Sequence, residues 1–206
     1  MPLQNRVLPD GTLVAQNWRG SVMGNRGGRI HDPDTRTLLK RKHASRRWIC
    51  CVLEFKNRQR TVMGEGYTEL FFWDEVSALA AGHRPCFECR RKDAVQFQLL
   101  WQKAFDLDEK PNADAMDKQL HRERMSEPTT LPEHAVPELP DGTMIRHDNV
   151  IYALRDQTVL KWSSDGYSEA AFPKGVVEVL TPASIRSVLA NGYRPEFCSS
   201  MLRKAI

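Results

Sequence analysis

Hydrophobic and polar positions along the chain predict two groups of strands with helices between them. Residues 48–55, WICCVLEF, are apolar, branched and aromatic over the length of one strand, and residues 68–73 form a second such run. Residues 60–64 are a candidate for a strand that returns beside the first. Residues 1–47 have no sustained apolar period, and the glycine-rich stretch at 19–32 indicates a loop. A small sheet is therefore expected to begin near residue 48.

Helical periodicity fills the middle of the chain. Asp74 is predicted to cap a helix over residues 75–81, which Gly82 ends. A second helix, beginning near Cys86, carries apolar residues at spacings of three and four, namely Ala94, Phe97, Trp101 and Phe105. We expect this stripe to lie in the core. A polar helix is predicted over residues 114–125.

A proline-rich stretch, residues 126–142, predicts an extended linker or surface loop and a domain boundary. Three further strands are predicted beyond it, over residues 144–154, 157–162 and 176–180. The first two form a hairpin that turns near Arg155. Thr181 is then predicted to cap a final helix, with Pro182 at its first position.

The composition favours a soluble protein. The chain has 206 residues, 41% of them hydrophobic, and no run of about 18 apolar residues that would span a membrane. Its first residues lack the apolar stretch of a secretory signal. Five cysteines, an odd number, favour reduced thiols over a disulfide framework. We therefore expect a cytoplasmic protein with no membrane partner.

Positive charge is concentrated in the first quarter of the chain, whereas acidic residues collect between Asp106 and Glu138. The net charge is +4. A basic region of this kind suits nucleic-acid phosphates, although a solvated basic surface is the commoner structure. The candidate phosphate contacts are Arg26, Arg29, Arg46, Arg47, Arg90 and Arg91. Glycines and arginines at 19–32 also suit a phosphate-binding loop or, equally, a structural turn.

The strongest chemical signal is the pair Cys86 and Cys89, two thiols separated by two residues at the start of a predicted helix. Thiols at this spacing can share one tetrahedral metal ion, and neighbouring arginines favour the thiolate. A zinc site needs further ligands, and Cys50 and Cys51 on the preceding strand are the obvious donors. The alternative is that Cys50 and Cys51 are only small buried hydrophobic residues of the strand.

Adjacent residues of a strand point to opposite faces, so Cys50 and Cys51 both reach one ion only if the strand bulges. Otherwise one of them ligates the metal and the other packs in the core. The fourth ligand would then be a histidine, for which the candidates are His31, His43 and His83.

The segment YTELFFWDEVSALAAGHRPCFECRRKD, residues 67–93, resembles the zinc-binding, methyl-accepting domain of the Ada DNA-repair protein. The resemblance extends to residue 48 if WICCVLEF is equivalent to the earlier cysteine strand of that family. It implies zinc as the cofactor and assigns the role of zinc ligand to Cys86 and Cys89. In the family, the first two cysteines are separated by three residues, whereas Cys50 and Cys51 are adjacent. No helix-turn-helix segment and no Pro-Cys-His-Arg run follows the motif.

We therefore expect an α+β fold, with helices and a small sheet around an Ada-like zinc module and a C-terminal unit of a β-hairpin and a helix. The expected segments are a basic N-terminal segment (1–47), the zinc module with its following helices (48–125), the proline-rich linker (126–142) and the β-rich unit (143–206). The expected function is zinc binding together with contact to DNA or RNA phosphates.

Two alternatives assign chemistry to the chain. The first is an enzyme acting on nucleic acid, either a metal-assisted phosphodiesterase that uses His31, Asp32 and His147 or a thiolate at Cys50 or Cys51 that accepts an alkyl group. The second is a redox module with a reversible disulfide between the cysteines of the Cys-x-x-Cys motif. The motif lacks the βαβ context of a thioredoxin-like site, which disfavours the redox alternative.

Overall fold

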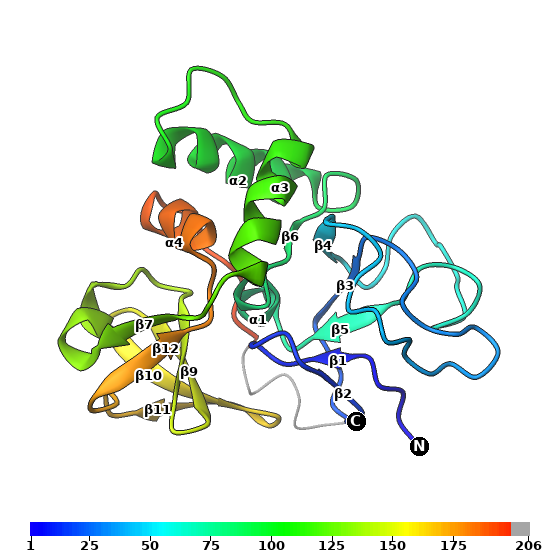
Figure 1. The fold of residues 1–206 in the computed structure, drawn as a ribbon, viewed down its shortest axis with the longest axis horizontal. Helices are drawn as coiled ribbons and strands as arrows, with labels where there is room; N and C mark the ends of the chain where they lie inside the picture. Colours follow the sequence, from blue (N-terminus) through cyan, green and yellow to red (C-terminus); the bar gives the residue numbers. More distant parts are fainter. Residues whose placement is uncertain (199–206) are drawn as a thin grey trace.

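The computed structural model describes residues 1–198, which form two six-stranded sheets with helices between and above them (Figure 1). The first sheet has the strand order β2-β1-β5-β3-β4-β6, and the second has the order β11-β10-β9-β8-β12-β7. Helices and sheets thus combine in an α+β fold, as the sequence predicts.

The first sheet is built from six short strands. They are β1 (Arg6–Val7), β2 (Leu13–Val14), β3 (Val22–Arg26), β4 (Trp48–Cys51), β5 (Leu70–Phe72) and β6 (Arg84–Pro85). Residues 1–47 therefore contribute three strands, which the sequence analysis missed. All five residues of β3 are buried, because Val22 packs in one core cluster and the next residue, Met23, packs in another on the opposite face of the sheet. The strand therefore shows no alternation of buried and exposed residues. Residues 60–64 form no strand, because β3 and β6 already occupy the two sides of β4.

The second sheet comes from the C-terminal part of the chain. Its strands are β7 (Thr129–Pro132), β8 (Met144–His147), β9 (Val150–Arg155), β10 (Thr158–Ser163), β11 (Gly166–Ala170) and β12 (Val176–Val179). The predicted linker at 126–142 is instead structured, because β7 pairs with β12 and the 3-10 helix η1 (Glu133–Glu138) follows it. The strand predicted over 144–154 is a hairpin of two strands, with Asp148 and Asn149 at its turn in the left-handed backbone region.

Residues 1–198 contain four α-helices. They are α1 (Glu75–Ala80), α2 (Arg91–Ala104), α3 (Ala113–Met125) and α4 (Ala183–Ala190). The Asp74 side chain caps α1 by accepting from the Ser77 amide at 2.9 Å, as predicted. The predicted cap of α4 is wrong: Pro182 is the cap residue, and the Thr181 hydroxyl accepts from the Met144 amide at 2.8 Å.

Helix α1 lies at the centre of the molecule, and all six of its residues are buried. Ala78 packs in the core of the first sheet, and Val76 and Ala80 pack against Met144 of the second sheet. Leu79 packs in a third cluster with α2, α3 and α4. One short helix thus contacts both sheets and the helical layer. The stripe predicted on α2 is buried at Ala94, Phe97 and Trp101, but Phe105, which follows the last helical residue, is 39% exposed and does not lie in the core as predicted.

Helices in the described part of the chain are too short and too polar to cross a lipid bilayer.

Candidate metal centre

Three cysteine sulfurs lie together at the edge of the first sheet. The Sγ atoms of Cys51, Cys86 and Cys89 all lie within 4.8 Å of one another. Cys51 is the last residue of β4, and Cys86 and Cys89 belong to the turn between β6 and α2. The first two are 9% and 8% exposed, and Cys89 is half-buried. This group can hold a metal ion.

The backbone of the turn brings the Cys-x-x-Cys pair to the strand. Strand β6 pairs in parallel with β4, with Pro85 opposite Cys50, and the Cys86 amide donates to the Cys50 carbonyl at 2.9 Å. The Glu88 amide donates to Cys86 Sγ at 3.4 Å. Helix α2 begins only at Arg91, so the two thiols lie on a turn before the helix and not in its first turn as predicted.

Cys50 does not belong to the group of three sulfurs. It is 0% exposed and packs in the core of the first sheet, on the opposite face of β4 from Cys51. Its Sγ accepts from Arg90 Nη1 at 3.5 Å. Burial raises the pKa of Cys50 to about 12. The strand does not bulge here, and the assignment of Cys50 as a metal ligand is therefore corrected.

The three clustered thiols influence one another's protonation. Hydrogen bonds from Cys51 and Cys89 lower the pKa of Cys86, because they stabilise its thiolate. The hydrogen bond that Cys51 donates to Cys86 in turn raises the pKa of Cys51. A bound cation would replace these protons and hold all three groups as thiolates.

The donor set fits zinc. Tetrahedral zinc with bonds of about 2.3 Å to sulfur places its sulfurs about 3.8 Å apart, a separation that is compatible with sulfurs lying within 4.8 Å of one another. Within residues 1–198 the group contains no fourth cysteine, histidine or acidic ligand. The structure thus supplies three of the four ligands of a tetrahedral ion.

Comparison of the chain with protein-family models, curated proteins and solved structures found no match.

The candidate histidine ligands have other partners. Both ring nitrogens of His31 are hydrogen-bonded, Nδ1 to Thr68 Oγ1 at 2.5 Å and Nε2 to the Gly64 carbonyl at 2.8 Å. The His83 ring is fully buried and packs against Trp48. The His43 ring lies 5.2 Å from the ring of His121. None of the three predicted alternatives joins the cysteine group.

The residues predicted to catalyse phosphodiester hydrolysis instead make hydrogen bonds that stabilise the fold. His31 is 1% exposed and its ring holds the loop before β5. The Asp32 carboxylate accepts from the Asp34 and Thr35 amides at 3.0 Å, as in an Asx turn. His147 Nδ1 bonds to the Val176 carbonyl at 3.1 Å, between β8 and β12. Within the described chain these residues form no cluster with a third metal ligand, so the structure gives phosphodiesterase chemistry no support.

Two of the predicted phosphate contacts are buried. Arg90 is 7% exposed and pairs with Glu75 at 2.9 Å and Asp93 at 2.8 Å. Arg26 is 3% exposed, and its guanidinium lies 4.1 Å from the centre of the Trp48 ring. Neither belongs to the outer surface, which corrects their assignment as surface contacts. Sequence could not reveal this, because arginine is usually exposed.

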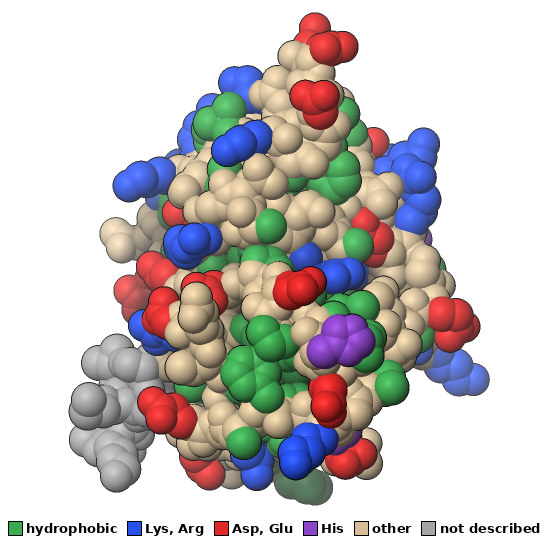
Figure 2. Space-filling model, turned by 90° about the vertical axis from the view of Figure 1, so that its left-hand side faces the viewer, with side chains coloured by type: hydrophobic (Ala, Val, Ile, Leu, Met, Phe, Trp, Pro, Cys, Tyr) green, Lys and Arg blue, Asp and Glu red, His purple; other side chains and the backbone are tan. Residues whose placement is uncertain are grey.

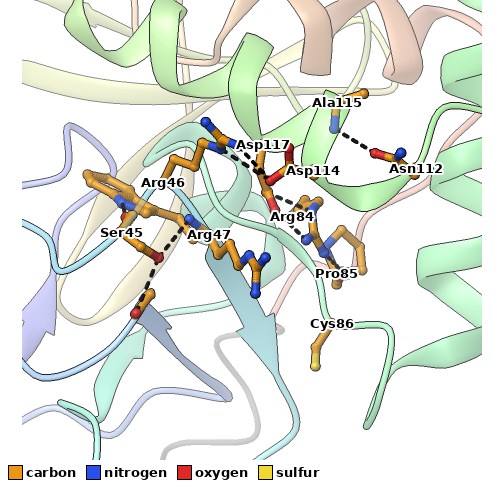
Figure 3. A network of polar contacts seen from close by, with 12 residues as sticks. Ser45, Arg46, Arg47, Arg84, Pro85, Cys86, Asn112, Asp114, Ala115 and Asp117 are labelled. Carbon is orange, nitrogen blue, oxygen red and sulfur yellow. Dashed lines mark hydrogen bonds and ion pairs between the residues drawn. The ribbon is translucent and has the colours of Figure 1, made fainter.

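The other predicted arginines lie at the surface. Arg47 and Arg91 are exposed, and Arg29 pairs with Glu65 at 3.2 Å. Arg46 pairs with Asp114 of α3 at 2.7 Å, beside the buried pair of Arg84 and Asp117 (Figure 3). In the same view, the Cys86 sulfur points away from these acidic groups (Figure 3).

Residues 40–47, KRKHASRR, form the densest basic run of this surface, and we call them the basic segment. The chain has no acidic residue between Asp34 and Glu54, and the basic segment leads directly into β4. On the side of the second sheet, acidic and basic side chains are instead interspersed around an apolar patch (Figure 2).

A cleft of about 900 Å³ lies beside the basic segment, and the sequence analysis did not anticipate it. Its walls come from the first sheet, from the end of α3 and from the second sheet. Arg26 and Trp48 line it from the first sheet, Arg124 from α3, and Arg146 from the second sheet. No sequence signal marks this cleft, because its residues come from distant parts of the chain.

Proposed function

We propose that the protein binds zinc through Cys51, Cys86 and Cys89 and contacts nucleic-acid phosphates through the basic segment. The observation that carries the proposal is the cluster of three sulfurs at the end of the strand that follows the basic segment. Thiolate donors in a tetrahedral arrangement favour zinc among the available divalent ions. Solvent or a bound molecule would complete its coordination.

The zinc module would be Ada-like in this proposal. The resemblance over residues 67–93 concerns the same turn that carries Cys86 and Cys89, and β4 supplies the third cysteine. The chain differs from that family in offering three clustered cysteines. Metal binding would fix the end of β4 to the turn before α2 and so stabilise the surface from which the basic segment projects.

Nucleic-acid contact would be electrostatic. Lys40, Arg41, Lys42, Arg46 and Arg47 are exposed and belong to one short segment. Phosphate contacts by such side chains release counterions, and the logarithm of the binding constant then falls linearly with the logarithm of salt concentration. The proposal predicts a salt-dependent affinity with little sequence preference.

The test compares two triple variants by fluorescence anisotropy with a labelled single-stranded oligonucleotide. Changing Arg41, Lys42 and Arg47 to Gln should lower the salt slope by about 2, since each phosphate contact to a single strand contributes about 0.7. Changing Lys92, Lys103 and Lys110 to Gln removes the same charge from an exposed region at α2 and should leave the slope nearly unchanged. Absence of binding at low salt, or equal losses in both variants, would contradict the proposal.

A second candidate function is alkyl acceptance by a thiolate of the cluster. The observation that favours it is the half-buried position of Cys89, which solvent reaches. The thiolate would attack an alkyl carbon of a phosphotriester, forming a carbon–sulfur bond while the carbon–oxygen bond breaks and a phosphodiester anion leaves. Incubation with methylated DNA should then add one methyl mass to Cys51, Cys86 or Cys89, and unchanged masses would rule the reaction out.

A further inference from the structure

The cleft beside the basic segment contains two guanidinium groups, Arg26 and Arg124, that have no carboxylate of the described chain within ion-pair distance. More distant carboxylates act on them, Asp10 on Arg26 and both Asp117 and Glu123 on Arg124. Arg26 donates from Nη2 to the Gly11 carbonyl at 2.7 Å. Arg124 donates to the carbonyls of Gly82 and Arg46 at 2.7 and 2.8 Å. Within residues 1–198, no ion pair joins either side chain to an acidic group. Buried charge of this kind is costly unless an opposite charge accompanies it.

Trp48 brings the two cations close to each other. The guanidinium carbons of Arg26 and Arg124 lie 4.1 and 4.3 Å from the centre of its ring. The Nε atoms of both arginines are buried without a hydrogen-bond partner in the described chain. Burial and, to a smaller extent, the charge of Arg124 together lower the pKa of Arg26 to about 9. An anion in the cleft would relieve this repulsion.

Three of the four acidic residues that line the cleft are already engaged, and the fourth, Glu127, is exposed. Asp10 and Glu178 both pair with Arg146, at 3.2 and 2.7 Å. The Glu123 carboxylate accepts from the Ser184 amide at 3.1 Å at the start of α4. Residues 40–42 add three further positive charges to the lining. The cleft therefore has a surplus of positive charge, which is greatest at the end formed by the first sheet and α3.

We propose that this cleft binds the phosphate group of a nucleotide, with Arg26 and Arg124 beneath the phosphate and residues 40–42 at the entrance. Guanidinium groups match the several acceptor oxygens of a phosphate, and phosphate neutralises more than one cation. The volume of about 900 Å³ suits a ligand of nucleotide size. The nucleotide can be free or one unit of a single strand. The inference goes beyond the proposed function, because a free nucleotide requires neither metal nor a polymer.

Isothermal titration of the full chain with adenosine monophosphate, adenosine and a short single-stranded oligonucleotide tests this inference. Adenosine monophosphate should bind and adenosine should not. Arg124→Gln should weaken binding by about ten-fold or more, because it removes a charge-assisted contact. Arg122→Gln is the matched control, since Arg122 is an exposed residue of the same helix and does not line the cleft.

The outcomes separate the two sources of the nucleotide. Tighter binding of the oligonucleotide, lost in Arg124→Gln, would identify a unit of a strand, and equal or weaker binding would identify a free nucleotide. Three results would each overturn the inference. The first is that neither phosphate compound binds at millimolar concentration, and the second is that adenosine binds as tightly as its monophosphate. The third is that Arg122→Gln and Arg124→Gln lose the same affinity.

Thermal melting tests the site even if Arg124→Gln is less stable than the natural chain. Inorganic phosphate should raise the melting temperature of the natural chain more than that of Arg124→Gln, with chloride at equal ionic strength as the reference. Phosphate also stabilises proteins generally by exclusion from their surface. An equal rise in both proteins would therefore indicate only this general effect and would overturn the proposed site.

Discussion

At the scale of single residues, His83 is the clearest example of a polar group placed in an apolar environment. It is 0% exposed, and its ring centre lies 4.9 Å from that of Trp48 and 4.6 Å from that of Phe72. Nδ1 lies 3.1 Å from the Ala81 carbonyl oxygen, whereas Nε2 is buried without a partner in the described chain. Burial lowers the pKa of His83 well below its usual value, and nearby arginine charges add to the effect.

This depressed pKa predicts that stability falls in mild acid. Below about pH 6.5 the unfolded chain binds a proton at His83 that the folded chain does not, so the free energy of unfolding decreases by up to about 1.4 kcal/mol per pH unit. The loss continues until the pH reaches the folded pKa. Urea unfolding between about pH 7 and pH 5 should show a smaller slope in His83→Phe than in the natural chain. Equal slopes would contradict the assignment.

Cysteine chemistry was partly predictable from the sequence. The spacing of Cys86 and Cys89 indicated a shared site, whereas the alternation of a strand left two possibilities, that both Cys50 and Cys51 join it at a bulge or that only one of them does. The sequence could not predict which of Cys50 and Cys51 joins the other two cysteines. Alternation places their side chains on opposite faces of the strand, but it does not show which face the turn with Cys86 and Cys89 contacts. Burial of Arg26 and Arg90 likewise depends on tertiary packing that no local pattern reports.

At the scale of elements, a buried ion pair links β6 to α3 close to the candidate metal site. Arg84 Nε and Nη2 donate to the two carboxylate oxygens of Asp117 at 2.9 and 2.7 Å. The two side chains are 5% and 1% exposed. Arg84 lies two residues before Cys86, so this pair fixes the approach of the cysteine turn to the sheet (Figure 3).

Removing one partner should therefore be costly. Asp117→Ala leaves a buried guanidinium without its partner and should lower the free energy of unfolding by about 3–5 kcal/mol. Asp114→Ala, one turn earlier on α3, breaks only the exposed pair with Arg46 and should cost about 0–1 kcal/mol. Urea unfolding of both variants measures the difference. Similar losses of the free energy of unfolding in both variants would contradict the stabilising role of the buried pair of Arg84 and Asp117.

Elements with clear periodicity were predictable, and short ones were not. Helix α1 follows from its capping residue and α2 from its apolar spacing, whereas α3 was predicted only as a polar helix. Strands β1 and β2 have only two residues each, too few to show a period. Strand β7 is an exposed strand at the edge of its sheet, and its two threonines and its proline are typical of a linker, so only the pairing with β12 shows that it is a strand.

At the scale of the whole molecule, the C-terminal segment is bonded to the start of the central helix α1. The Tyr193 hydroxyl donates to Glu75 Oε1 at 2.6 Å, and the Glu196 amide donates to Glu75 Oε2 at 3.1 Å. The Cys198 amide donates to Asp74 Oδ2 at 3.1 Å. Distant parts of the sequence thus meet at α1, where the two sheets also meet.

This arrangement predicts that the described chain unfolds as one unit. Residues 143–206 alone should not fold, because Met144 and Ala153 would lose the contact with Val76 and Ala80 of α1. The full chain should give one urea transition by circular dichroism and by tryptophan fluorescence. A fragment of residues 143–206 with a cooperative transition of its own would contradict this prediction.

The metal site is the central claim, and elemental analysis of the purified protein tests it most directly. We expect about one zinc per chain, lost in Cys86→Ser because a ligand is removed. Folded Cys50→Ser should retain the zinc, because Cys50 faces the core on the other side of β4. Absence of metal from the natural chain, or equal loss of zinc from both folded variants, would contradict the assignment of Cys51, Cys86 and Cys89 as the metal ligands.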